Sequence, residues 1–328
     1  MSRKMDQQGY AALETLDFSG VTRVAVIGEC MLELSAVESE SSELKRLAYG
    51  GDTLNTAFYL AGSGQQVSYF SALGEDSQSQ WMIQEWRKAG IDCDHVRQVV
   101  GRVPGLYMIE TDAVGERRFL YWRDSSPARE LFDDKQQAAQ LFHELEKFEL
   151  LYFSGVTLSL YKDAALKDLL NFLTGYRRQG GLVAFDSNYR PHGWSNRHRA
   201  ETIYRDFYQQ VDLALPTLED DMALFNLSTS EALLEKLASL GVSEIAMKQG
   251  PKGSLVNAEP GTGEAAIAVP ALEITRVVDT TGAGDSFNGG YLSARIKGES
   301  ILEAARKGHR FAAEVIQYRG AVVTIDFS

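Results

Sequence analysis

The sequence predicts an α/β fold in which a central, mostly parallel sheet is flanked by helices and carries a small additional β-sheet. Beyond residue 130, short apolar runs alternate regularly with helix-length segments, which is the pattern of repeated βα units. Residues 24–27 form an apolar run that ends at Gly28, typical of a strand buried on both faces of a parallel sheet. Residues 99–123 instead alternate and are interrupted by turn residues, which predicts a hairpin outside the βα series.

The length and the charge limit the class of protein. A chain of 328 residues can bury one substantial core, and a single large α/β domain with a small appendage fits as well as two domains. The net charge is −12, from 33 basic and 45 acidic residues. This acidic balance argues against a nucleic-acid backbone or an anionic membrane surface as a partner, although it allows a local basic pocket for a phosphate.

The cysteines and the first residues indicate the compartment. Cys30 and Cys93 are too few for a disulfide framework or a zinc site, so we expect a reducing compartment and two core thiols. Residues 1–20 have no continuous apolar run and do not resemble a secretory signal, and no later segment is long enough to span a bilayer. We therefore expect a cytoplasmic protein with a loose N-terminal extension over residues 1–20 and one domain over residues 21–328.

The first part of the chain is expected to supply a small sheet as well as strands of the main sheet. Residues 32–49 are polar and weakly alternating, like an exposed strand pair, and with residues 99–123 they would form a lid over a site. The next helix would begin with Asp52 as its cap and run to about residue 61. Further strands are expected over 67–73, 106–110 and 117–122, and a further helix over 77–89.

The second part of the chain predicts a parallel sheet with ligands at the carboxyl ends of its strands. His309, on the last helix, is expected to be packed or solvated rather than catalytic. Strands are expected over 150–153, 182–185 and 213–215, with another that ends at 277–278, and helices over 135–147, 164–178, 200–209, 286–296 and 301–317.

Residues 279–287 would connect a strand end to a helix through a run without bulky side chains. Free N–H groups at a helix start, helped by the helix dipole, attract phosphate oxygens. A carboxylate at Asp285 would repel such an anion unless it has a chemical task, such as accepting the proton of a hydroxyl that attacks a phosphoryl group. Taken alone, Asp285 would be interpreted as a helix N-cap instead.

Two further glycine-containing segments are candidate ligand sites. Gly50 and Gly51 precede Asp52 and Asn55, and glycines let a ligand approach the backbone while an amide suits sugar hydroxyls. A plain tight turn into a helix explains these residues equally well. Residues 28–31 do not match the dinucleotide fingerprint, and the chain lacks the G-x-x-x-x-G-K-[ST] phosphate loop, so phosphate binding would have to come from elsewhere.

The segment 279–287 resembles the second signature of the PfkB (ribokinase-like) carbohydrate kinases, and the resemblance extends from about residue 23 to residue 325. It implies a ribokinase-like fold, with Asp285 as the catalytic base and Gly282, Ala283 and Gly284 as the anion hole. It also identifies residues 50–55 as the first sugar-binding element of the family. The lid would close on the sugar and also form the contact of a homodimer.

The resemblance further implies a set of ligand contacts. The substrate would meet Gly50, Gly51, Asp52, Asn55, Tyr107, Tyr121, Arg123 and Arg190. ATP would meet Asn188, Lys248, Gly250, Gly253, Gly282 and Gly284. Many relatives have Asn-x-x-Glu, an element linked to magnesium, where this chain has Thr217 and Asp220, so Asp220 is only a weak candidate ligand for Mg²⁺. A helix-start acidic cluster is the alternative for this segment.

Segments 28–31, 50–56, 104–107, 121–123 and 316–321 are similar to those of the sugar-acid kinases in this family. This similarity implies transfer of the γ-phosphoryl group of ATP to the 6-hydroxyl of 2-dehydro-3-deoxy-D-gluconate. A kinase of a neutral sugar such as fructose or ribose is one alternative, which Arg123 and Arg190 argue against. A non-catalytic sugar-responsive protein on the same fold is another, which an intact Asp285 argues against.

Overall fold

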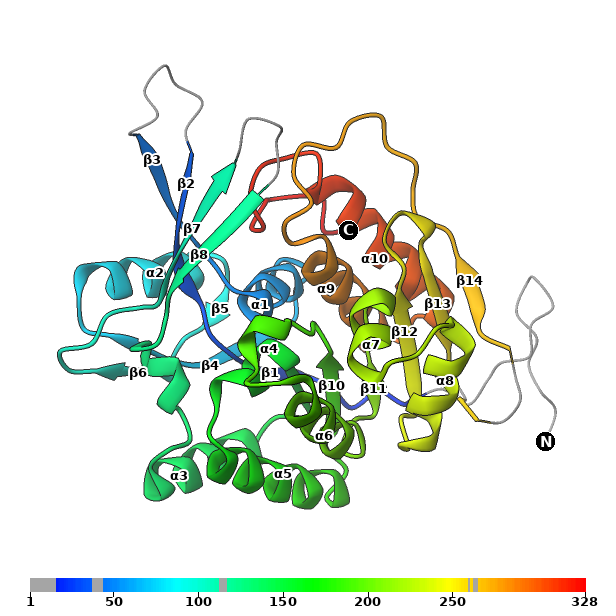
Figure 1. The fold of residues 1–328 in the computed structure, drawn as a ribbon, viewed down its shortest axis with the longest axis horizontal. Coiled ribbons are helices and arrows are strands. Elements are labelled where there is room, and N and C mark those ends of the chain that lie inside the picture. The colour runs from blue at the N-terminus through cyan, green and yellow to red at the C-terminus, as the bar shows by residue number, and fades with distance from the viewer. Residues whose placement is uncertain (1–15, 37–43, 112–116, 259, 262–264) are drawn as a thin grey trace.

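A ten-stranded sheet crosses the part of the chain that the computed structural model describes, residues 16–36, 44–111, 117–258, 260–261 and 265–328 (Figure 1). Its strands are β1 (Arg23–Ile27), β4 (Gln66–Gly74), β5 (Ile91–Asp92), β6 (Val96–Val99), β9 (Leu150–Ser154), β10 (Leu182–Asp186), β11 (Leu213–Ala214), β12 (Glu244–Lys248), β13 (Ser254–Asn257) and β14 (Ile267–Val269). They lie in the order β14-β13-β12-β11-β10-β9-β1-β4-β5, with β6 paired to β4. Only the β12–β13 and β13–β14 pairings are antiparallel among these strands, so the predicted mostly parallel sheet is confirmed.

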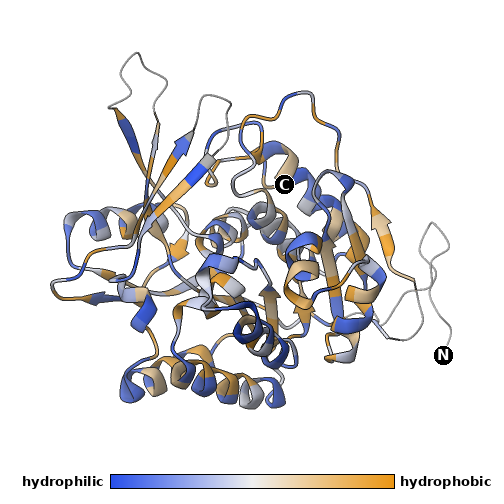
Figure 2. Ribbon diagram, in the orientation of Figure 1, coloured by the Kyte–Doolittle hydropathy of each residue, from blue (hydrophilic) through white to orange (hydrophobic). Residues whose placement is uncertain are grey.

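Both faces of this sheet are buried, because alternate strand residues belong to two separate cores. Ala25 and Ile27 of β1 pack in one core, and Val24 and Val26 pack in the other. This explains why the central strands are continuous apolar runs in the sequence instead of alternating ones. In Figure 2, strands of this sheet carry the hydrophobic colour.

Helices cover each face of the sheet. One layer contains α1 (Asp52–Gly62), α2 (Ser77–Lys88), α9 (Ala283–Ile296) and α10 (Ile301–Val315). The other contains α3 (Lys135–Leu145), α4 (Gly155–Leu160), α5 (Asp163–Arg178), α6 (Arg197–Tyr208), α7 (Leu218–Phe225) and α8 (Ser230–Ser239). Polar N-caps begin several of them; Asp76, for example, accepts hydrogen bonds from the backbone of Gln78 and Ser79 at the start of α2.

The small sheet contains β2 (Met31–Ala36), β3 (Lys45–Gly50), β7 (Leu106–Thr111) and β8 (Arg117–Trp122) in the order β3-β2-β7-β8. It projects from one end of the molecule, at the upper left of Figure 1. The expected hairpin is confirmed by the antiparallel pairing of β7 with β8, although its turn lies outside the described residues. The predicted start of this sheet at residue 99 is wrong, because Val99 ends β6 and pairs with β4 of the main sheet.

Two other expectations are corrected. Val277 and Val278 do not end a strand: the backbone N–H groups of Val278 and Asp279 donate to the carbonyl of Ile316 after α10, and the Val277 side chain is exposed. The loose extension expected over 1–20 does not hold for its last residues, because Phe18 is buried beneath the Arg295 guanidinium. Residues 1–15 lie outside the described residues. No helix in the described ranges is both long and apolar enough to cross a membrane.

The strand order determines where a ligand can bind. β1 lies between β4 and β9, and the chain first builds outward on the β4 side before it returns to β9. In open α/β sheets, such a reversal opens a crevice at the carboxyl ends of the strands. Residues that follow β1, β9, β10 and β12 therefore meet at one end of the sheet, where the N-terminus of α9 also lies.

Candidate active site

The helix α9 begins directly in the glycine-containing segment, with Gly282 as its N-cap. Gly282 has a φ of +77°, and a Cβ there would lie 2.7 Å from the Cβ of Ala321, so both the backbone conformation and the space require glycine. Ala283, Gly284 and Asp285 form the first turn, where helix geometry leaves N–H groups without an intrahelical acceptor. The amide of Ala283 nevertheless donates to the carbonyl of Thr280 at 3.2 Å, which leaves Gly284 and Asp285 as the better anion donors.

Asp285 does not cap its helix, since α9 has no side-chain cap and the carboxylate points to α1 instead. Its Oδ2 accepts a hydrogen bond of 2.7 Å from Nδ2 of Asn55. Burial raises the pKa of Asp285 to about 7; the Asp52 charge and, more weakly, Asp186 add to the rise, while the Asn55 hydrogen bond and Lys248 oppose it. A carboxylate with this pKa can accept a proton near neutral pH.

The first residues of α1 form the wall opposite Asp285. The cap is Gly51 and not the predicted Asp52, since the chain enters the helix one residue earlier. A Cβ on Gly51 would lie 2.1 Å from the carbonyl oxygen of Glu29, so this close approach requires glycine. Asp52 accepts a 2.7 Å hydrogen bond from Asn188, and burial raises its pKa. Oδ1 of Asn55 is buried and has no hydrogen-bond partner, which is an unusual state for a buried acceptor.

The side chains predicted on the small sheet lie at its base, next to α1. The Tyr107 hydroxyl donates to the carboxylate of Glu33, and a Cβ on Gly50 would lie 2.4 Å from that hydroxyl. Tyr121 is partly exposed and stacks on His192 with ring centroids 5.5 Å apart. Together these contacts connect the small sheet to the segment after β10.

Both predicted guanidinium groups have carboxylate partners in the protein. Arg123 forms an ion pair with Glu29, whose side chain is 2% exposed, while the Arg123 Nε and the Glu29 Oε1 have no partner. Arg190 pairs with Asp220 at 2.8 Å, and its side chain is 48% exposed. Arg123 and Arg190 therefore reach the same end of the sheet, but neither is an isolated positive charge.

The residues predicted for the nucleotide divide into two groups. Gly250 and Gly253 lie in the turn between β12 and β13 with φ of +56° and +102°, so both have a local reason to be glycine. Lys248 does not point outward: its Nζ lies 3.0 Å from Oδ1 of Asp186 and 3.0 Å from Oδ1 of Asn288. Asn188, also predicted for ATP, instead contacts Asp52 on the α1 side.

The sequence patterns did not single out Asp186, Asn288 or Asp221. Asp186 ends β10, a strand-end position that could have been noted, whereas Asn288 lies in the interior of α9, where its sequence neighbours give no signal. Asp221 is fully buried and accepts hydrogen bonds from Ser187 and Tyr208, and burial raises its pKa to about 7. It fixes the start of the segment that carries Asn188 and Arg190.

His309 is packed as expected, bonded to Ser254, and Cys30 and Cys93 are buried free thiols.

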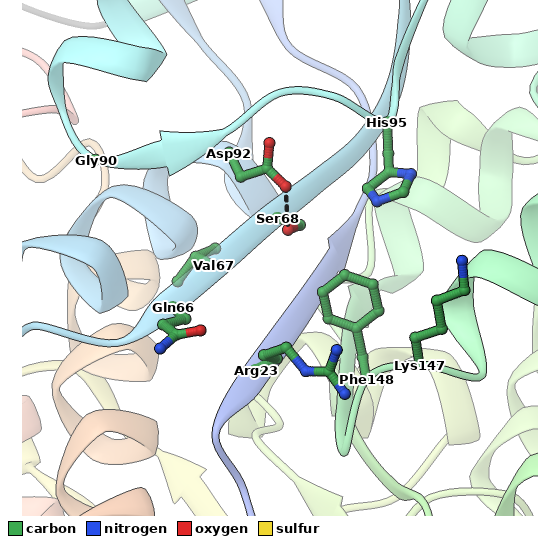
Figure 3. Close-up of a pocket in the computed structure, with 9 residues that line it drawn as sticks. All are labelled: Arg23, Gln66, Val67, Ser68, Gly90, Asp92, His95, Lys147 and Phe148. Atoms are coloured by element: carbon green, nitrogen blue, oxygen red, sulfur yellow. Dashed lines mark hydrogen bonds between the residues drawn. The ribbon is translucent and has the colours of Figure 1, made fainter.

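A cavity of about 440 Å³ lies away from this site, at the opposite ends of the strands (Figure 3). Arg23 and Gln66, which begin β1 and β4, line it, as do Asp92, His95 and Lys147. Its charged groups are already satisfied: Arg23 pairs with Glu149, Lys147 pairs with Glu144, and Asp92 accepts a hydrogen bond from Ser68. This cavity therefore offers no unpaired charged group among Arg23, Lys147 and Asp92.

Comparisons with known proteins show which family this chain resembles. The model of the pfkB family carbohydrate kinases matches residues 21–326. The 2-dehydro-3-deoxygluconokinase of Escherichia coli strain K12 is 40% identical over 307 residues, which are 92% of this chain and 97% of that protein. The crystal structure of 2-dehydro-3-deoxygluconokinase from Thermotoga maritima has a TM-score of 0.78 at 21% identity and covers 93% of this chain and 97% of its own. A putative ribokinase II from E. coli, in complex with ATP and Mg²⁺, has a TM-score of 0.78 at 19% identity, covering 92% and 95% of the two chains.

The raised pKa of Asp285 predicts how stability changes with pH. A carboxyl whose pKa is higher in the folded than in the unfolded state costs stability as it ionises, so the loss occurs as pH rises from about 4 to about 7. Asp285→Asn removes this cost. The variant should therefore gain stability relative to wild type as the pH rises: the difference in the free energy of unfolding, variant minus wild type, should be larger at pH 8 than at pH 4, by at most about 4 kcal/mol. Urea unfolding at the two pH values measures this difference, with the exposed-site variant Asp94→Asn as a control; an equal difference at both pH values contradicts the prediction.

Proposed function

The chain belongs to the pfkB family of carbohydrate kinases, and we propose that it transfers the γ-phosphoryl group of ATP to the 6-hydroxyl of 2-dehydro-3-deoxy-D-gluconate, giving 2-dehydro-3-deoxy-6-phospho-D-gluconate. The match of the family model to residues 21–326 confirms the family resemblance found in the sequence. The observation that supports the reaction best is the Asp285 carboxylate, with a pKa near 7, in the first turn of α9 beside Asn55. The choice of substrate is supported by the 40% identical relative.

The proposed reaction needs a base and a place for developing charge. Asp285 accepts the proton of the attacking hydroxyl, which turns that oxygen into a better nucleophile. The first-turn amides of Gly284 and Asp285, with the positive end of the α9 dipole, bind the charge that develops on the transferring phosphoryl group. The same helix therefore positions both the base and the anion donors, which suits an in-line transfer.

On the substrate side, we assign the sugar hydroxyls to the polar groups of α1. The unpartnered Oδ1 of Asn55 is an acceptor that a sugar hydroxyl would satisfy. Asp52, with its second oxygen on Asn188, adds a carboxylate next to it. Gly50 and Gly51 keep the backbone close to Glu29 and Tyr107, so the sugar would lie between α1 and the base of the small sheet.

ATP would approach from the side of Gly250 and Gly253, with Gly282 and Gly284 beneath its phosphates. Mg²⁺ prefers oxygen ligands and usually keeps several phosphate and water ligands. The partly exposed carboxylate of Asp220 fits such a role, although it also pairs with Arg190; the described residues contain no group of three or more His, Cys, Asp or Glu side chains arranged for a metal. When bound, the ion would neutralise phosphate charge. A need for ATP agrees with the cytoplasmic location predicted from the sequence.

One observation favours a neutral sugar as a second candidate substrate. Arg123 and Arg190 each have a protein carboxylate as a partner, so their charges are already compensated. For a sugar acid to gain from them, its carboxylate must reach donors that those pairs leave free, such as the unpartnered Nε of Arg123. A sugar acid nevertheless remains compatible with these ion pairs, because a guanidinium has five N–H donors and can bind a second carboxylate.

Asp285→Asn tests the proposed base. The change should lower kcat by about a hundredfold to ten-thousandfold, because it removes the proton acceptor, while Asn55 and the amides of α9 remain to bind ligands. A coupled assay of ADP release measures kcat, and calorimetry with ATP and the sugar acid measures binding. Turnover near the wild-type rate would show that Asp285 is not the base.

Arg190→Ala tests whether this guanidinium binds the carboxylate of the sugar acid. Removing a guanidinium that binds the carboxylate in the closed site should cost about 2 to 5 kcal/mol in sugar-acid binding and leave ATP affinity nearly unchanged. Arg123→Ala should act similarly, but it also leaves the buried Glu29 charge unpaired. The matched double variant Arg123→Ala/Glu29→Gln removes that charge, so it should recover stability without recovering sugar-acid affinity. If the double variant recovered both stability and sugar-acid affinity, Arg123 would have only a structural role.

The small sheet is the proposed contact of a homodimer. Several large apolar side chains on it are exposed, among them Leu47 at 43%, Phe119 at 40% and Trp122 at 54%, and exposed apolar surface on a soluble domain often marks an interface. Figure 2 shows apolar positions along these projecting strands. Closure of this sheet over the sugar remains a prediction.

Trp122→Glu tests the dimer. A charge in an apolar contact should shift the protein from dimer to monomer, because the charge loses its hydration on burial. Sedimentation velocity at micromolar concentration measures the shift. The control is Leu272→Glu, a change at a side chain that is also exposed, at 52%, but lies outside the small sheet. A wild-type monomer, or a Trp122→Glu dimer, contradicts the proposal.

A further inference from the structure

A buried polar cluster lies beneath the N-terminus of α9 and contains Asp186, Lys248 and Asn288. The three residues come from β10, β12 and α9 and are 2%, 8% and 0% exposed. Lys248 Nζ donates to Oδ1 of Asp186 and to Oδ1 of Asn288, both at 3.0 Å. Nδ2 of Asn288 donates back to Oδ2 of Asp186 at 2.7 Å. The cluster is therefore a closed ring of hydrogen bonds around one ammonium group.

The ammonium of Lys248 lies next to the anion-binding turn. A Cβ built on Gly284 would be 3.8 Å from Lys248 Nζ, so the charge lies directly beside the backbone that would hold a phosphoryl group. An ammonium has three N–H donors, and Asp186 and Asn288 accept two of them among the described residues. The side chain keeps 10% exposure, so it is not sealed from the site.

The cluster also extends to the residue proposed as the base. Nδ2 of Asn288 contacts the Tyr152 hydroxyl at 3.1 Å, and that hydroxyl lies 3.1 Å from Thr56 Oγ1. Thr56 Oγ1 lies within hydrogen-bond distance of two backbone carbonyls, that of Asp52 at 3.2 Å and that of Asp285 at 3.3 Å, and its single hydrogen is shared between them. A series of polar contacts thus leads from the Lys248 ammonium to the first turns of α1 and α9, where Asp52 and Asp285 lie.

We propose that Lys248 supplies a fixed positive charge at the floor of the anion-binding turn during phosphoryl transfer, and that Asp186 and Asn288 are positioning residues that hold it there. The inference rests on the proposed kinase function. Preorganised charges in a water-poor site act strongly on charge that develops in the transition state. An ion pair that served stability alone would gain little from burial, since apolar replacements of such pairs are often neutral or stabilising.

The same geometry connects Lys248 to the protonation of Asp285. The groups that face Asp285 are the Asp52 and Asp186 carboxylates, which raise its pKa, and the Asn55 amide and Lys248, which lower it. Lys248→Met should therefore raise the pKa of Asp285, and Asp186→Asn should lower it. A purely structural role for the cluster does not predict opposite shifts.

Kinetics of Lys248→Met test the charge. The kcat with ATP and 2-dehydro-3-deoxy-D-gluconate should fall by about a hundredfold or more, with a much smaller change in the KM of the sugar, as for an interaction made in the transition state. The double variant Asp186→Asn/Lys248→Met removes both charges and leaves none unpaired, so it should regain thermal stability and remain slow. A double variant with wild-type kcat would overturn the inference.

Carbon-13 NMR titration of the side-chain carboxyl groups gives a second readout that needs no turnover. The Asp285 signal is assigned by its absence in Asp285→Asn. Its pKa should be higher in Lys248→Met and lower in Asp186→Asn than in wild type; shifts absent in both folded variants would overturn the inference. If wild type does not phosphorylate the sugar acid, the proposed function fails, and this titration still tests the position of Lys248.

Discussion

Close packing of α9 against α1 is the constraint on which the candidate site depends. A Cβ on Gly289 would lie 2.5 Å from the Cβ of Tyr59, and one on Gly290 would lie 3.0 Å from the Cα of Gly308. Glycines at these two positions therefore let α9 fit between α1 and α10. This approach brings Asn55 within 2.7 Å of Asp285. A wider spacing of the helices would separate the base from its partner and from the first sugar-binding segment.

The same packing explains the electrostatics. It removes water from Asp285 and places it near Asp52 and Asp186, and both effects raise its pKa. Lys248 and Asn55 oppose the rise, so the balance of these groups sets the pH at which the carboxylate is available as a base. An anion-binding helix terminus, a base and a buried cation are thus arranged by α9 and by two elements that contact it, α1 and β12. The distant cavity of Figure 3 has no comparable arrangement.

Local sequence features predicted much of this architecture. The apolar run of residues 24–27, the hairpin between 106 and 122 and the turn at Gly282 are each determined by neighbouring residues, and the structure has all three. Features that depend on distant partners were not predictable. The valines at 277–278 look like a strand but bond to the end of α10, and the inward turn of Lys248 depends on Asp186, which lies 62 residues away. The pairing of Arg123 with Glu29 similarly crosses from the small sheet to the end of β1.

We propose that this site transfers a phosphoryl group to a sugar acid. The most direct measurement is kcat/KM for ADP release with 2-dehydro-3-deoxy-D-gluconate, 2-keto-gluconate, fructose and ribose, with phosphorus-31 NMR to locate the new ester. We expect the sugar acids to be preferred by orders of magnitude and the ester to form at the 6-hydroxyl. A preference for fructose or ribose would contradict the sugar-acid assignment, and the absence of turnover with all four would contradict the assignment of this site as a kinase of these sugars.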